Sequence, residues 1–134
     1  MKTESKKVMD DFLSHKELIS DDLMDEAEEV LGTMPFILPI LRERPEYFVL
    51  SSLADFMVGR PQHLDPKTAE LIAIAAAAGA GAESCAKLHM KAAQKEGASR
   101  EEIFDTILIA CLIGKTKVMA PALRIFAEVV PKKD

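Results

Sequence analysis

The sequence predicts an all-α protein of about six to seven helices. Alanine and leucine, which lose little side-chain freedom in a helix, are abundant, whereas the aromatic content is only 5% and tryptophan is absent. Apolar residues recur at helical spacing, as at Val8 and Phe12 near the N-terminus. The alternation of β-branched or aromatic residues with polar ones, which is typical of strands, is missing.

In the first half of the chain, capping residues and prolines indicate where helices begin and end. Ser20 is a candidate N-cap with acidic residues after it, and Gly32 suits the end of the same helix. Pro45 suits the first turn of a later helix. The helical segments expected here cover residues 3–18, 20–31, 34–41 (a short, proline-interrupted helix) and 45–59.

In the second half of the chain, the residues that indicate where helices begin are clearer. Asp65 followed by Pro66 predicts an N-cap and a first helical residue. Ser99 and Glu102 form a capping-box pattern, in which each side chain binds the other's free backbone amide. Pro121 is expected to break or bend the last helix. The expected segments are 66–78, 84–96, 100–117 and 122–130.

Composition and charge narrow the class of protein. A chain of 134 residues without repeats or linkers suits a single domain over 1–134. The net charge of −5 and the absence of a basic block argue against a nucleic-acid partner. The N-terminus is polar and lacks a signal sequence, so a cytoplasmic location is expected. The apolar run 71–82 is too short to span a membrane, so we expect a buried core helix there and no membrane partner.

Glu70 is the first candidate for chemistry. It begins a segment that is apolar around the whole helix, and such helices are buried on most sides. A carboxylate there would lose its hydration unless a partner lay nearby, and carboxylates in such places serve as general acids or bases. The alternative is an exposed carboxylate in the first turns of the helix, stabilised by the helix dipole.

Cys85 and His89 are the second candidate. Their spacing of four residues places both side chains on one face of a helix. Cys85 falls in the first turn of that helix, where backbone amides favour a thiolate, and a nearby imidazole can take the thiol proton. The alternative is a buried, inert cysteine and a surface histidine.

The remaining cysteine and histidines are weaker candidates. Cys111 lies within an apolar run and is expected to serve in packing, although sequence alone leaves open its approach to Cys85. His15 and His63 lie in polar surroundings and are expected at the surface, with a role at a site rim open for His63. The residues show no second pair of metal ligands and no nucleotide-binding glycine motif, so neither a metal nor a cofactor is expected.

Residues 64–114 resemble the core of a known family, the carboxymuconolactone decarboxylase / alkylhydroperoxidase-D-like family. The matching pieces occur in the family's order and spacing. They are Leu-Asp-Pro-Lys-Thr-Ala-Glu-Leu-Ile-Ala (64–73), Gly-Ala-Glu-Ser-Cys-Ala-Lys-Leu-His (81–89), Gly-Ala-Ser-Arg-Glu-Glu-Ile (97–103) and the apolar helix to Gly114.

The resemblance implies a functional site, and this sequence differs from the family pattern at one position of that site. In the peroxidase branch a glutamate, two cysteines in a C-x-x-C pair and a histidine form the site, and by position these are Glu70, Ala82, Cys85 and His89. Because Ala82 replaces the first cysteine, the family's internal disulfide cannot form. The resemblance also implies an antiparallel helix bundle in a homo-oligomer, often a trimer or hexamer, with the cysteine-bearing helix facing a cleft between subunits.

Three functions follow as hypotheses. The favoured one is a thiol-dependent oxidoreductase with peroxidase-like activity, in which Cys85 is the redox nucleophile and His89 and Glu70 relay protons. Its reducing partner would be an external thiol, protein or small molecule, unless Cys111 or a second subunit supplies the thiol. The second is a lyase acting on a small acidic lactone through His89 and Glu70, with cationic help from Lys87, Lys91 or Arg60. The third is a non-enzymatic oligomer that binds a ligand or a partner protein.

Overall fold

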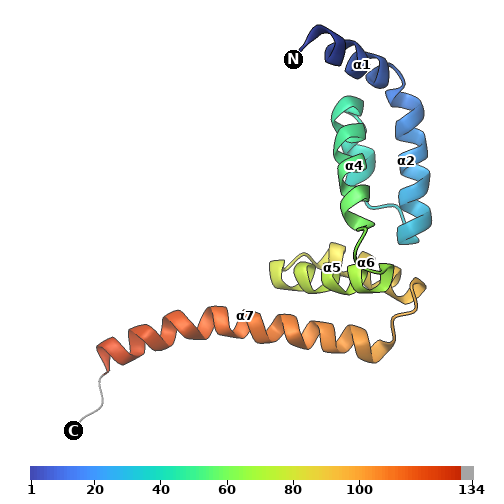
Figure 1. Cartoon of the computed structure of the whole chain (residues 1–134). Coiled ribbons are helices and arrows are strands. Elements are labelled where there is room, and N and C mark those ends of the chain that lie inside the picture. Colours follow the sequence, from blue (N-terminus) through green and yellow to red (C-terminus); the bar gives the residue numbers. More distant parts are fainter. Residues whose placement is uncertain (131–134) are drawn as a thin grey trace. The chain divides into compact units, whose positions relative to one another are not determined.

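The structure, a computed structural model, describes residues 1–130 and contains seven α-helices and no strand within that range (Figure 1). The all-α prediction is confirmed. The chain divides into two compact units, Met1–Ala69 and the part that begins at Glu70. Each unit is described by itself.

The N-terminal unit is built around a pair of helices, α2 and α4. Its helices are α1 (Thr3–Ser14), α2 (Lys16–Leu31), α3 (Ile37–Leu41) and α4 (Pro45–Gly59). Phe48 and Val49 of α4 are fully buried against Leu23 of α2. Partly buried apolar side chains surround these three residues: Phe12, Ile19, Met24, Leu38, Leu41, Leu53 and Phe56. The unit therefore holds a small but continuous apolar core.

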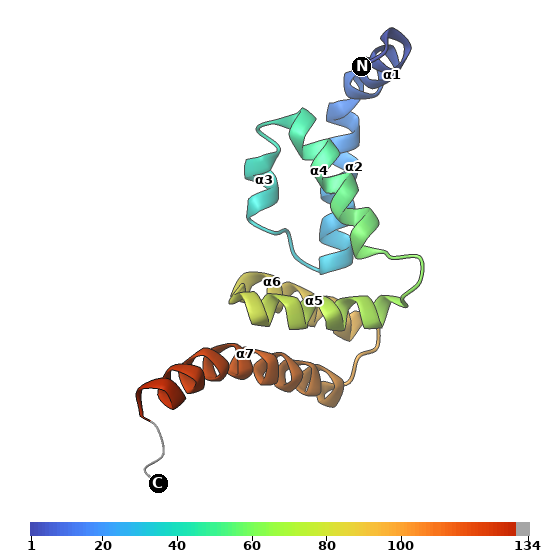
Figure 2. The same ribbon diagram turned by 60° about the vertical axis from the view of Figure 1, so that its left-hand side comes forward.

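Ion pairs show that α2 and α4 run in the same direction. Lys16 at the start of α2 pairs with Glu46 at the start of α4. Glu26, in the later part of α2, pairs with Arg60 just after α4, with 2.5 Å between Oε1 and Nη1. This direction is possible because α3 and its flanking loops carry the chain back before α4 begins (Figure 2).

The boundary between the first two helices differs from the prediction. The first helix was expected to reach residue 18, but α1 ends at Ser14 and α2 begins at Lys16. Ser20 is therefore not an N-cap: it lies inside α2, fully buried, and its hydroxyl has no hydrogen-bond partner. The acidic residues after Ser20 suggested a helix start, but the helix continues upstream because Lys16–Ile19 are compatible with helical structure.

In the C-terminal half, the predicted caps are confirmed. Helix α5 (Pro66–Ala80) begins after Asp65, whose carboxylate accepts hydrogen bonds from the Thr68 amide at 3.0 Å and the Thr68 hydroxyl at 2.6 Å. Helix α7 (Arg100–Val129) begins after Ser99, which forms the full capping box with Glu102. These local bonds satisfy amides that the first helical turn leaves free.

Helices α5 and α6 (Glu83–Lys95) form a helical hairpin with a short turn. Only two residues separate them, and the first is Gly81, whose φ of 69° lies in the left-handed region that favours glycine. The prediction of a buried helix over 71–82 is only partly correct. Ile74 and Ala77 of α5 are buried, but Ile72 on another face is 52% exposed. One face of this apolar helix is thus covered within the chain, and the others are not.

Helix α7 is continuous over 30 residues, so the expected break near Pro121 is wrong. Proline removes one backbone hydrogen bond, but good helix formers on both sides sustain the helix, which curves gently (Figure 1). No residue of α7 is buried. By length and composition α7 is apolar enough to cross a membrane.

Candidate functional site

The structure brings Glu70 and His89 together. Glu70 lies in the second turn of α5 and His89 lies near the middle of α6, 19 residues later. The imidazole Nδ1 lies 2.7 Å from Oε2 of the carboxylate, a hydrogen-bonding distance. The α5–α6 hairpin makes this contact possible because it folds the two helices back on each other.

Burial distinguishes the two partners. The side chain of Glu70 is 14% exposed and that of His89 is 33% exposed. The alternative of an exposed first-turn carboxylate is therefore wrong, and the expected desolvation is offset by a partner. A carboxylate that accepts from Nδ1–H leaves Nε2 as the imidazole nitrogen that can take up or release a proton.

Cys85 lies one turn before His89 on the same helix. It is the third residue of α6, within the first turn as predicted, and its thiol is free and exposed. Side chains on a helix lean toward the N-terminus, so an imidazole at position i+4 leans over the turn that carries the cysteine. The alternative of a buried Cys85 is therefore wrong, and its reactivity stays a prediction.

Ala82 occupies the position immediately before α6, where it is the N-cap residue. Its backbone is not helical, and its methyl group offers no capping hydrogen bond. A side chain at this position would lie beside the first turn of α6, which is where the family pattern places the first cysteine. The absence of a thiol here leaves Cys85 without a local disulfide partner.

The structure corrects the prediction for Cys111. It was expected to pack in a core, but it is a free, exposed cysteine on α7. The run around it is apolar, but a run of this kind is buried only where another element covers it. In the described part of the chain, the helix face that carries Cys111 is not covered.

The other predicted candidates lie outside the Glu70–His89 pair. His15 and His63 are exposed, as expected. Lys87 and Lys91 are exposed residues of α6. Arg60 is engaged by Glu26 and lies over the Phe56 ring, 6.0 Å from its centre. Of the three cationic candidates, only the two lysines share a helix with His89.

Within residues 1–130, no cluster of three or more histidine, cysteine, aspartate or glutamate side chains has the arrangement of a metal site. Cys85, His89 and Glu70 together offer a thiol, an imidazole and a carboxylate on the α5–α6 hairpin. Imidazole and carboxylate groups are the kinds of side chain that take part in proton transfer, and an ionised thiol is the kind that attacks soft electrophiles.

Comparison with known proteins gives one match. No curated protein and no solved structure matches the chain. The model of the carboxymuconolactone decarboxylase family matches residues 45–128, a span that runs from α4 almost to the end of α7 and contains Glu70, Cys85 and His89. Since the match covers more than half of the chain, the protein belongs to the carboxymuconolactone decarboxylase family.

Proposed function

We propose that the protein is a thiol-dependent oxidoreductase that reduces a peroxide, with Cys85 as the nucleophile. The observation that carries the proposal is the 2.7 Å contact between His89 and Glu70, one helical turn from an exposed cysteine at a helix N-terminus. Each group has a place in the chemistry: an exposed thiol as the nucleophile, an imidazole one helical turn away, and a carboxylate that orients the imidazole.

The proton path follows from the hydrogen bond. Glu70 accepts from Nδ1–H, so the Nε2 lone pair of His89 accepts the proton of the Cys85 thiol. The imidazolium that forms is stabilised by the carboxylate, whose own exposure is small. This role resembles that of an acid residue behind a catalytic histidine, which holds the ring and its tautomer without itself becoming protonated.

The oxidation step then balances as follows. The Cys85 thiolate attacks the hydrogen-bearing oxygen of a hydroperoxide, an S–O bond forms and the O–O bond breaks. The leaving alkoxide takes the proton from His89, which gives an alcohol and a sulfenic acid on Cys85. The peroxide is reduced by two electrons and the cysteine sulfur is oxidised by two.

The return step needs an external thiol, because Ala82 offers none. A first thiol condenses with the sulfenic acid, which releases water and leaves a mixed disulfide on Cys85. A second thiol attacks the sulfur of the first, which releases the reduced Cys85 and a disulfide of the reductant. The proposed partner is therefore a low-molecular-weight thiol or a thiol protein, because such a reductant can reach an exposed Cys85.

The test is the rate of Cys85 alkylation by iodoacetamide as a function of pH, in a Cys111→Ser background. We expect fast alkylation at neutral pH and about a tenfold or greater loss of rate in Glu70→Gln and His89→Ala. His15→Ala is the matched control, because His15 is an exposed histidine whose ring nitrogen bonds Asp11 and Ser14 instead, and it should react as the parent does.

The same variants then test turnover. With hydrogen peroxide and a small dithiol as substrates, the parent should consume peroxide and Cys85→Ser should not. A Cys85 that alkylates as slowly as free cysteine, with no response to either substitution, contradicts the proposal. A loss of peroxide that persists in Cys85→Ser also contradicts it.

A lyase is the second candidate, because the Glu70–His89 pair is complete without the thiol. In that reaction the pair would serve as acid and base, and the exposed Lys87 or Lys91 would help to hold an anionic lactone. Decarboxylation of such a lactone that survives Cys85→Ser and is lost in His89→Ala would favour the lyase over the oxidoreductase.

A further inference from the structure

Cys85 and Cys111 are the two cysteines of the chain, and both belong to the C-terminal unit. Both thiols are free and exposed, so packing protects neither of them from reagents in solution. The chemistry proposed above uses only Cys85, and Ala82 takes away the thiol that the family pattern would place nearest to it. Whether Cys111 can serve Cys85 instead depends on where the two residues lie along their helices.

The two thiols lie at the same height along consecutive helices. Helix α6 runs toward the turn at 96–99, and α7 runs back from that turn alongside the hairpin (Figure 1, Figure 2). Cys85 lies ten residues before Lys95, the last residue of α6, and Cys111 lies eleven residues after Arg100, the first residue of α7. At a helical rise of about 1.5 Å per residue, the two cysteines are about 15 Å and about 16 Å from the turn.

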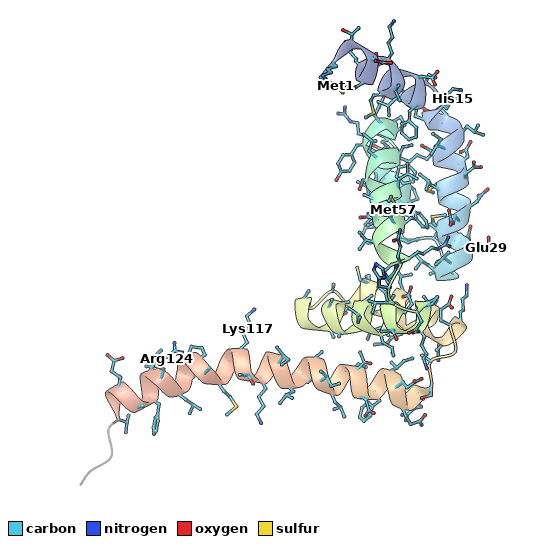
Figure 3. All side chains as sticks on the ribbon, viewed as in Figure 1. Met1, His15, Glu29, Met57, Lys117 and Arg124 are labelled. Carbon is cyan, nitrogen blue, oxygen red and sulfur yellow. The ribbon has the colours of Figure 1, made fainter. Side chains whose placement is uncertain are left out.

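The length of α7 relative to the hairpin agrees with this position. In Figure 3 the labelled Lys117 lies past the end of the α5–α6 hairpin, and Arg124 lies farther along. Cys111 precedes Lys117 by six residues, which correspond to about 9 Å of helix and bring it back to the end of the hairpin. That end contains the first turn of α6, in which Cys85 is the third residue.

Each thiol also borders a side of its helix that is partly covered. Cys111 follows the half-buried Ile107 by four residues, and residues four apart differ by only about 40° around a helix. Cys85 has the same angular relation to His89, whose side chain is 33% exposed and contacts α5. Both cysteines therefore lie at the edge of the side that packs within the unit, where a thiol is exposed but not turned away.

Small residues leave room for α6 and α7 to approach each other at this height. The space beside Gly114, three residues after Cys111, is open where a Cβ atom would stand. Ala82 and Ala86 flank Cys85 on α6. Helices that pack with their axes about 8 Å apart bring facing Cα atoms within the roughly 4.4–6.8 Å that a disulfide spans. No residue of α7 is buried, so such an approach disrupts no core.

We infer that Cys85 and Cys111 are a redox pair, in which Cys111 closes an intrachain disulfide between α6 and α7 after Cys85 has been oxidised. The inference rests on the proposed function for the oxidation of Cys85. It goes beyond that function by assigning the first reducing thiol to the chain itself. The family pattern pairs two cysteines within one C-x-x-C segment, whereas this pair would join two helices.

The step balances without a further reagent. The Cys111 thiolate attacks the sulfur of the Cys85 sulfenic acid, an S–S bond forms and the S–O bond breaks. The hydroxide that leaves takes the proton that the Cys111 thiol released and becomes water. An external dithiol then reduces the disulfide by exchange and is itself oxidised by two electrons. A thiol held nearby on the same chain has an effective concentration on the order of millimolar, so it competes with external thiols for the sulfenic acid.

The experiment treats the reduced, full-length protein with one equivalent of hydrogen peroxide and identifies the products by peptide mass spectrometry without reduction. We expect a disulfide between Cys85 and Cys111 in the parent, which should run as a single chain on non-reducing electrophoresis. In Cys111→Ser the sulfenic acid should persist, and its dimedone adduct should be about tenfold or more abundant than in the parent.

Cys111→Ser combined with Leu112→Cys is the matched control. It moves the thiol by one residue and about 100° around α7, at a position that is 59% exposed. The disulfide with Cys85 should form about tenfold or more slowly than in the parent, because the displaced thiol points away from α6. Circular dichroism checks that both variants keep the helix content of the parent.

The outcomes separate this inference from the proposed function. A sulfenic acid that persists in the parent overturns the pair and leaves the peroxidase standing. A disulfide between two chains, or equal rates in the parent and the control, also overturns the pair. A glutathione redox buffer provides the converse test, because it can join adjacent thiols without peroxide. An intrachain disulfide in that buffer, with no reaction toward peroxide, supports the pair and contradicts the proposed function, whereas its absence under both conditions overturns the pair.

Discussion

The α2–α4 pair and the α5–α6 hairpin are both built from helices, but they differ in the kind of side chain that they bury. In the first, Phe48 and Val49 are fully buried and the charged side chains, such as Lys16 and Glu46, pair at the surface. In the second, a carboxylate and an imidazole are themselves partly buried and bonded to each other. Buried apolar side chains hold the N-terminal unit together. In the hairpin, a polar pair is partly buried, and an exposed thiol lies one helical turn from it.

This difference indicates that the α2–α4 core mainly stabilises the fold, whereas the α5–α6 hairpin carries the side chains that are capable of chemistry. A buried apolar side chain stabilises in proportion to the surface it removes from water, and it does nothing else. A partly buried hydrogen bond between polar side chains adds less stability, because the loss of hydration opposes the attraction between the partners. The hairpin holds groups that can exchange a proton, and the α2–α4 core contains none. Substitutions in the two regions should therefore have different consequences.

The largest expected effect is in the N-terminal core. Phe48→Ala removes a fully buried ring and leaves a cavity, so the free energy of unfolding in urea should fall by about 3–5 kcal/mol. Tyr47→Ala is the control on the same helix, because Tyr47 is 61% exposed, and it should change the value by less than about 0.5 kcal/mol. Equal losses in the two variants would contradict the assigned core.

A smaller effect is expected in the hairpin. His89→Ala leaves the Glu70 carboxylate, 14% exposed, without its partner, so urea unfolding should show a loss of about 1–3 kcal/mol. Replacing both residues by leucine should cost less than the two single leucine substitutions added together, because no polar group is then left unpaired. Additive losses would show that the two side chains do not interact.

Two serine substitutions are expected to differ by about 1 kcal/mol in their effect on the free energy of unfolding. Ser99→Ala removes the N-cap of α7 and should lower the free energy of unfolding by about 1 kcal/mol. Ser20→Ala should leave it unchanged or raise it, because the buried hydroxyl of Ser20 has no partner. Thermal unfolding followed by circular dichroism distinguishes the two, and a loss at Ser20 as large as that at Ser99 would argue for an unseen hydrogen bond there.

The smallest expected effect is the pH dependence of stability that comes from the Asp65 carboxyl. Hydrogen bonds from the Thr68 hydroxyl and amide hold the pKa of the Asp65 carboxyl below its ordinary value of 3.8. The folded state therefore favours the charged form, so the stabilisation is present above pH 3.8 and is lost as the pH falls through the lowered pKa. Asp65→Asn keeps an acceptor oxygen but does not titrate, so its melting temperature should depend less on pH below about 4 than that of the parent. Parallel acid profiles for the two proteins would contradict this role.

Much of the architecture was predictable because its causes are local. The Asp65 cap, the capping box of Ser99 and Glu102, the end of α2 at Gly32 and the start of α4 at Pro45 each depend on residues within one turn. The family resemblance came from motifs of the same kind. The failures are those where local signals compete, as at Ser20, which follows the rules for a cap but lies inside a helix that begins four residues earlier.

By itself, the sequence determined that the chain is helical, where most helices begin and end, and which side chains are capable of chemistry. Those properties depend on backbone preferences and on neighbours three or four residues away. Only the tertiary structure decided that Glu70 meets His89 across 19 residues, that Ser20 is buried and that Cys111 and its apolar neighbours on α7 are exposed. Burial depends on whether another surface covers a side chain, and an apolar run does not show which of its faces will be covered.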